Sequence, residues 1–151
     1  MGLSGAGLLM RDGEEILLPQ DIFRKIVDHC RRLRPEEACG LVAADASGRA
    51  VEVLPVTNSL HSPVRYQMET REQFDAMKRI RIEGWSLFAI FHSHPLSEPA
   101  PSPTDIRQAF YPEAYMIIVG LEREPAVVRG FVVEDGRARE LPLRTVSDTI
   151  S

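Results

Sequence analysis

The most constraining feature of the sequence is an apolar run, Trp85 to Phe91, that ends abruptly in His92-Ser93-His94-Pro95. A run of this length that is almost continuously apolar predicts a central strand buried on both faces of a sheet. Residues two apart in a strand project to the same side, so His92 and His94 point the same way off the end of this strand. Two imidazoles side by side are a natural pair of zinc ligands.

A third metal ligand is predicted beyond the Pro- and Ser-rich loop that follows the histidines. Asp105 closes the segment Ser102-Pro103-Thr104-Asp105, which also has the residues of a helix start. A helix cap made by Ser102 and Asp105 would explain both residues without any chemistry, but it leaves the paired imidazoles without a third ligand. Because the loop can fold back on the strand end, we expect His92, His94 and Asp105 to hold a metal ion with one position open to water.

A zinc hydrolase also needs a general base for the attacking water, and Glu37 is the candidate. It stands just before Cys39-Gly40, at the start of a predicted strand. Spacing alone does not place Glu37 near His92, and a solvated acid beside Glu36 is the alternative interpretation. Cys39 shares a face with Glu37 if both lie in the strand, although a small buried apolar residue is the favoured interpretation of this thiol.

The remaining elements predict one domain of the α/β (α+β) class, with a single mixed sheet flanked by helices. In the second predicted helix, Thr70 is the expected N-cap with Gln73 reaching back to it, and Phe74 is expected to face the core with its neighbours on that side. Asp135-Gly136 predicts a tight hairpin. Helices are expected from 21 to about 34 and from 70 to about 83, and strands over 15–18, 39–44, 50–56, 115–121, 126–134 and 137–141.

The composition narrows the domain organisation and the partners. The 151 residues suit one domain over 15–143, with a flexible N-terminus at 1–14 and a polar tail at 144–151. The net charge of -4 forms no basic stripe, so nucleic acid is not expected as a partner. Nor is a membrane, because no apolar run would span a bilayer. Few cysteines and no export signal favour the cytoplasm, and a homodimer is compatible with the sequence.

These motifs together resemble the JAMM (MPN+) zinc metallopeptidases, and most of all their small prokaryotic members. The resemblance covers roughly residues 19 to 143 and rests on Glu37-Ala38-Cys39-Gly40-Leu41, His92-Ser93-His94-Pro95 and Ser102-Pro103-Thr104-Asp105, with Thr57-Asn58, Ser62-Pro63 and Tyr66 in support. It implies a curved mixed sheet of cytidine-deaminase-like architecture and one catalytic Zn²⁺ ion on His92, His94 and Asp105. It also implies that Glu37 is the general base and that Ser102 donates a hydrogen bond to the oxyanion.

The same resemblance implies a substrate. The family hydrolyses amide or isopeptide bonds next to the C-terminus of ubiquitin or ubiquitin-like proteins, and its small prokaryotic members act on sulfur-carrier-type partners that end in Gly-Gly. We therefore expect cleavage after the Gly-Gly terminus of a ubiquitin-like or sulfur-carrier protein. The chain has no obvious room for the long insertions with which eukaryotic deubiquitinases grip ubiquitin. Sulfur transfer and removal of protein conjugates are equally compatible with this activity.

Two other functions remain open from the sequence. One is a zinc amidohydrolase that acts on small amides or short peptides. The other is a non-catalytic MPN interaction module, although members of that kind usually lack the metal ligands. The deaminase pattern H-x-E with P-C-x-x-C is missing, as is the H-E-x-x-H pattern of another zinc protease class.

Overall fold

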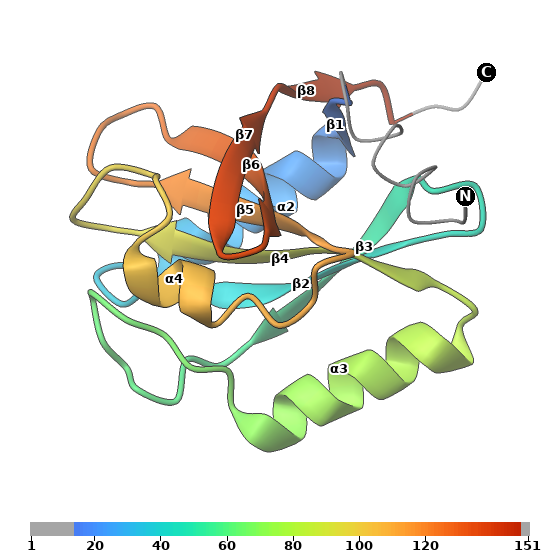
Figure 1. Ribbon diagram of the computed structural model, residues 1–151, viewed down its shortest axis with the longest axis horizontal. Coiled ribbons are helices and arrows are strands. Elements are labelled where there is room, and N and C mark those ends of the chain that lie inside the picture. Colours follow the sequence, from blue (N-terminus) through green and yellow to red (C-terminus); the bar gives the residue numbers. More distant parts are fainter. Residues whose placement is uncertain (1–13, 149–151) are drawn as a thin grey trace.

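A six-stranded mixed sheet forms the centre of the molecule, in the order β3-β2-β4-β5-β6-β7 (Figure 1). The computed structural model describes residues 14–148, so the N-terminus expected to be flexible lies outside the described residues apart from Glu14. The elements are β1 (Ile16–Pro19), α2 (Gln20–Leu33), β2 (Cys39–Ala44), β3 (Ala50–Val56), α3 (Thr70–Ile82), β4 (Ser86–His94), α4 (Pro103–Arg107), β5 (Tyr115–Gly120), β6 (Val127–Glu134), β7 (Arg137–Leu141) and β8 (Leu143–Val146).

The predicted central strand is β4, which pairs antiparallel with β2 and parallel with β5. It is longer than the sequence indicated, because it continues through the two histidines to His94. Backbone hydrogen bonds sustain this extension: the Ser93 amide donates to Ala38 O at 3.0 Å, and the Leu121 amide donates to His94 O at 3.1 Å. The histidines therefore lie within a paired strand, which holds their backbone rigid.

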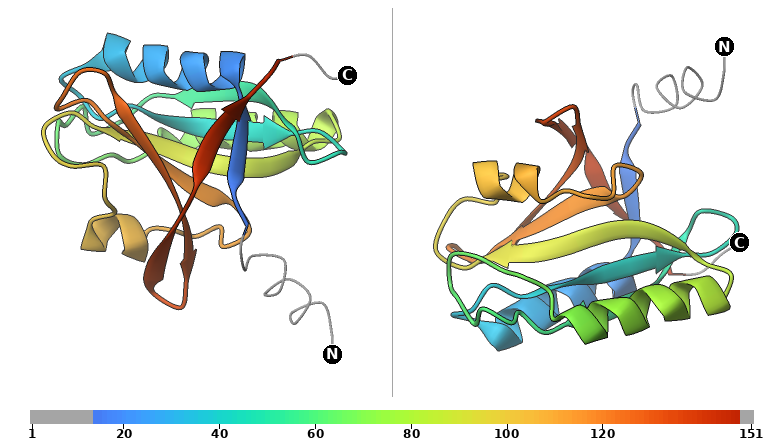
Figure 2. Two further views of the ribbon diagram at one scale, coloured as in Figure 1. Left: turned by 90° about the horizontal axis from the view of Figure 1, so that it is seen from above. Right: turned by 60° about the horizontal axis from the view of Figure 1, so that its bottom comes forward.

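Helices cover both faces of the sheet, as the sequence predicted. In Figure 2, α2 and α4 lie on opposite sides of it, and in Figure 1 α3 runs along the lower edge. The core on the α2 side includes Ile22, Ile26, Val42, Phe91 and Val119, and the core on the α3 side includes Leu41, Val56, Met68 and Ile80. No helix within residues 14–148 is long and apolar enough to cross a bilayer.

The start of α3 differs from the prediction. Its N-cap is Glu69, whose side chain accepts from the Glu72 amide at 2.9 Å, and not Thr70, which is the first helical residue. Contacts with Thr57 explain this choice, because the Glu69 amide donates to Thr57 O and the Thr57 amide donates to a Glu72 carboxylate oxygen. Phe74, expected in the core, is 59% exposed, so the apolar side of α3 is narrower than predicted.

A second, two-stranded sheet also departs from the expectation of a single sheet. β1 pairs parallel with β8, from Ile16 opposite Leu143 to Pro19 opposite Val146. The segment from Arg144 to Val146, expected to be part of a polar tail, is thus ordered as a strand. The Arg144 guanidinium supports this pairing through an ion pair of 3.1 Å with Glu15.

We expect Gly40→Ala to destabilise the sheet next to the histidines by about 3 kcal/mol, since extra atoms in a packed core force side chains or backbone to move. A Cβ atom at Gly40 would lie 2.5 Å from the buried Phe91 ring and 2.8 Å from the Leu54 carbonyl oxygen. Urea denaturation of the variant and the wild-type protein measures the difference. An unchanged free energy of unfolding would show that Phe91 can move aside freely, contrary to this account.

Candidate metal centre

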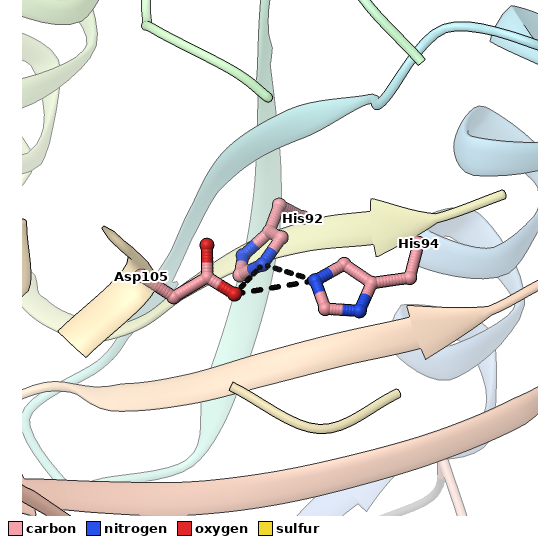
Figure 3. Close-up of side chains that lie close together, drawn as sticks. All are labelled: His92, His94 and Asp105. Carbon is pink, nitrogen blue, oxygen red and sulfur yellow. Dashed lines mark hydrogen bonds and ion pairs between the residues drawn. The ribbon is translucent and has the colours of Figure 1, made fainter. Parts of the chain in front are cut away.

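Two elements bring three ligand-type side chains together. Alternation along β4 places His92 and His94 on one side of the strand, and α4 supplies Asp105 from its first turn (Figure 3). A capping box fixes α4, in which the Ser102 hydroxyl accepts from the Asp105 amide at 3.0 Å and the Asp105 carboxylate accepts from the Ser102 amide at 2.9 Å. The helix start and the convergence of the three predicted ligands are thus both present, and the cap itself orients the carboxylate.

The three ligand atoms form a nearly equilateral triangle. The Nε2 atoms of His92 and His94 are 3.2 Å apart, and Asp105 Oδ2 lies 3.1 Å from the first and 3.2 Å from the second. All three side chains are buried. A tetrahedral zinc ion with bonds of about 2.0 Å separates neighbouring ligand atoms by about 3.3 Å, so the triangle matches one face of such a tetrahedron. The residues present therefore fit a zinc ion with one open coordination position.

Neighbouring groups hold the two imidazoles in orientation. His94 Nδ1 lies 2.7 Å from the carbonyl oxygen of Glu98, so a proton on Nδ1 leaves Nε2 free as a ligand. The Tyr66 ring stacks on the His92 ring with 4.7 Å between centroids. Among residues 14–148, the buried His92 Nδ1 has no hydrogen-bond partner. The sequence could not point to Glu98, because a backbone carbonyl carries no residue-specific signal.

Metal binding requires neutral imidazoles and an ionised carboxylate, and the pKa values of His92 and Asp105 favour those states, whereas that of His94 favours the protonated imidazole. Burial lowers the pKa of His92. Burial also acts to lower the pKa of His94, but hydrogen bonds with Asp105 and the Glu98 carbonyl outweigh it and raise that pKa. Although burial alone would raise the pKa of Asp105, hydrogen bonds from both histidines hold it below its usual range.

Glu37, the predicted general base, lies just before β2 and is only 4% exposed. Burial raises the pKa of its carboxyl group to about 7, while the charge of His94 lowers this pKa and that of Asp105 raises it. The Ser93 amide donates to Ala38 O, so the residue next to Glu37 is bonded to the strand between the two histidines. Cys39 is fully buried and its thiol donates to Val56 O at 3.3 Å, outside the group of converging ligand atoms. Glu37 is thus a buried acid next to the strand that carries the histidines, and its role as the general base stays a prediction.

The raised pKa of Glu37 predicts that the free energy of unfolding of the metal-free protein decreases as the pH rises. Below pH 4.5 the carboxyl is protonated in both folded and unfolded chains, whereas above about pH 7 the folded protein must ionise a buried group. Stability is therefore lost as the pH rises through this window, and Glu37→Gln should remove roughly 3 kcal/mol of that loss. Urea denaturation in EDTA at pH 5 and pH 8 tests this, with Glu36→Gln as the matched control. Equal pH dependence for the wild-type protein and Glu37→Gln would contradict it.

Comparisons with known proteins show which family this chain resembles. Residues 19–132 match the family described as prokaryotic homologs of the JAB domain. The chain is 31% identical over 144 residues to the CysO-cysteine peptidase of Mycobacterium tuberculosis, covering 92% of this chain and 98% of that one. It is 34% identical over 127 residues to the probable TtuB-protein conjugate cleaving protease of Thermus thermophilus, covering 83% and 80% of the two chains.

A solved structure shares the fold of this chain. The solution structure of protein DSY2949 from Desulfitobacterium hafniense superposes with a TM-score of 0.79 at 31% identity, over 88% of this chain and 94% of that one. The family match covers most of the sequence and contains all three ligand-type residues. The chain therefore belongs to the prokaryotic homologues of the JAB domain, the small prokaryotic JAMM-type family that its sequence motifs indicated.

Proposed function

We propose that this protein is a zinc-dependent metallopeptidase that hydrolyses the amide or isopeptide bond after the C-terminal Gly-Gly of a ubiquitin-like or sulfur-carrier protein. The observation that carries the proposal is the triangle of His92 Nε2, His94 Nε2 and Asp105 Oδ2, with sides of 3.1 to 3.2 Å. The buried Glu37 beside this triangle adds the base that such a hydrolase requires.

The names of the relatives support the proposed substrate class. One relative is named as a peptidase of CysO-cysteine and another as a protease that cleaves TtuB-protein conjugates. Both are matched over at least four fifths of their length, so the similarity includes most of each protein. The chain's two cysteines, Cys30 and Cys39, are buried free thiols, which suits a reducing cytoplasm.

The chain's own residues would perform the proton transfers and the orientation. When bound, zinc supplies Lewis-acid activation of water and of the scissile carbonyl group. Glu37 takes a proton from the attacking water and later delivers it to the departing amine, a role that a pKa near 7 suits. The Ser102 hydroxyl accepts a hydrogen bond from the Asp105 amide, which leaves its own proton free to donate to the oxyanion.

The direct test is cleavage of a small sulfur-carrier protein that ends in Gly-Gly and is extended by a single cysteine or a short peptide. Zinc-loaded protein should release the extension and leave a Gly-Gly terminus, detected by intact-protein mass spectrometry. A matched fusion with Ala-Ala at the junction, and a reaction in EDTA, should stay uncut. No cleavage across several such partners would refute the proposal, and cleavage of small amides alone would favour the amidohydrolase.

A further inference from the structure

A buried amide in the loop between β3 and α3 connects that loop to Glu37. Asn58 is only 1% exposed, although its neighbours in the loop are largely at the surface. Its side-chain oxygen accepts from the amides of Leu60 at 3.0 Å and Gln67 at 3.1 Å. Its side-chain nitrogen donates to the carbonyl oxygens of Glu37 and Arg65, each at 3.0 Å. Such a fully satisfied buried polar group fixes a unique local arrangement.

The amide and the carbonyl group of Glu37 both bond to this loop, whereas β4 bonds to the next residue, through the Ala38 amide that donates to Ser93 Oγ at 2.8 Å. β2 begins its pairing with β4 at Cys39, two residues later. The Glu37 carbonyl accepts from Asn58, and the Glu37 amide donates to Ser62 O at 2.8 Å. Both backbone polar groups of Glu37 thus depend on the loop that the Asn58 side chain organises.

The same side chain also anchors the ring packed against a metal ligand. Arg65 and Gln67, which Asn58 bonds through their backbones, are the two residues on either side of Tyr66. The Tyr66 ring stacks on His92. The Asn58 side-chain amide therefore connects the segment that carries the Glu37 carboxylate to the segment whose Tyr66 ring covers the His92 imidazole.

We propose that Asn58 is a positioning residue, which holds the Glu37 backbone so that its carboxylate stays in place beside the His92–His94–Asp105 group. This inference rests on the proposed function, because Glu37 is the general base of the proposed reaction. The three ligand-type residues belong to β4 and α4, and the hydrogen bonds of the Asn58 side chain go to other residues, so the loss of its amide should leave zinc binding intact. A displaced general base lowers kcat, since misplacement by about 1 Å can cost about 100-fold.

The test compares Asn58→Asp with Ser59→Ala. Asn58→Asp keeps the size and an acceptor oxygen but cannot donate to the Glu37 carbonyl when ionised. Ser59→Ala removes another hydrogen bond of the same loop, from Ser59 Oγ to Gln67 O at 3.1 Å, without touching Glu37. Asn58→Ala serves as a second variant in case the buried aspartate prevents folding. Amide hydrogen exchange by NMR, zinc content, and kcat with KM on the fusion protein are measured for each.

Both Asn58 variants should exchange the Glu37 amide at least about tenfold faster, because its hydrogen-bonded loop opens more often. The amides of β4 should stay protected, zinc content should match that of the wild-type protein, and kcat should fall about 100-fold. Ser59→Ala should behave as the wild-type protein. Wild-type exchange at Glu37, equal loss of protection throughout β4, or an unchanged kcat would each overturn the inference. A wild-type protein that cleaves nothing would instead refute the proposed function, since the exchange measurement needs no substrate.

Discussion

Glu37→Gln is expected to lower kcat on the Gly-Gly fusion by roughly 10³-fold, because general acid–base catalysis contributes typically 10² to 10⁴. Gln keeps the shape of the side chain but can neither accept the proton of the attacking water nor deliver it to the amine. Zinc binding should persist, since Glu37 is outside the three converging ligand atoms. Single-turnover cleavage and zinc analysis of the same sample measure both quantities.

Glu36→Gln is the control for this substitution, because Glu36 is the adjacent acid and its carboxylate contacts His61 Nδ1 at the surface, at 3.2 Å. It should cleave at the native rate, which would also select Glu37 over Glu36 as the base. Cleavage by Glu37→Gln at the native rate would show that the proposed proton transfers are wrong, even with zinc fully bound.

Asp105→Ala is expected to weaken zinc binding more than 100-fold, because even the loss of a residue that only orients a ligand typically costs 10- to 100-fold. The carboxylate is the one acidic member of the group and is held ionised by hydrogen bonds with His92 and His94. Competition with a chromogenic zinc chelator gives the dissociation constants. Turnover at low zinc should disappear with the metal.

The capping box makes a control necessary, because Asp105→Ala also removes an acceptor for the Ser102 amide. Ser102→Ala breaks the box from its other side and leaves all three ligand atoms in place. It should bind zinc nearly as tightly as the wild-type protein. If the two variants lost zinc equally, the helix start and not the carboxylate would be what the metal requires.

Local patterns predicted much of the fold. β2, β3 and β7 have the predicted bounds, and the Asp135-Gly136 turn has positive φ at both residues, as a two-residue hairpin of this kind requires. The failures involve long-range contacts. β8 pairs with β1 across the length of the chain, with no turn between them that a sequence pattern could reveal. The N-cap of α3 is Glu69 and not Thr70, because the Glu69 amide donates to the carbonyl oxygen of Thr57, a loop residue.

In the candidate site too, the features set by local patterns could be predicted, and those set by long-range contacts could not. Strand alternation sufficed to place His92 beside His94, and the Ser-x-x-Asp pattern located the helix that presents Asp105. Spacing could not bring Glu37 to them, because that proximity depends on how β2 pairs with β4. In the sequence, Asn58 only supported the family resemblance, and its structural role could not be predicted, since that role depends on the five backbone groups that folding brings around its side chain.

Anomalous diffraction at the zinc absorption edge, from crystals of the zinc-loaded protein, tests the central geometry most directly. We predict one strong peak about 2.0 to 2.2 Å from His92 Nε2, His94 Nε2 and Asp105 Oδ2, with a solvent molecule as the fourth ligand. A peak elsewhere, three side chains that point apart, or a cation enclosed by four protein ligands would contradict the account.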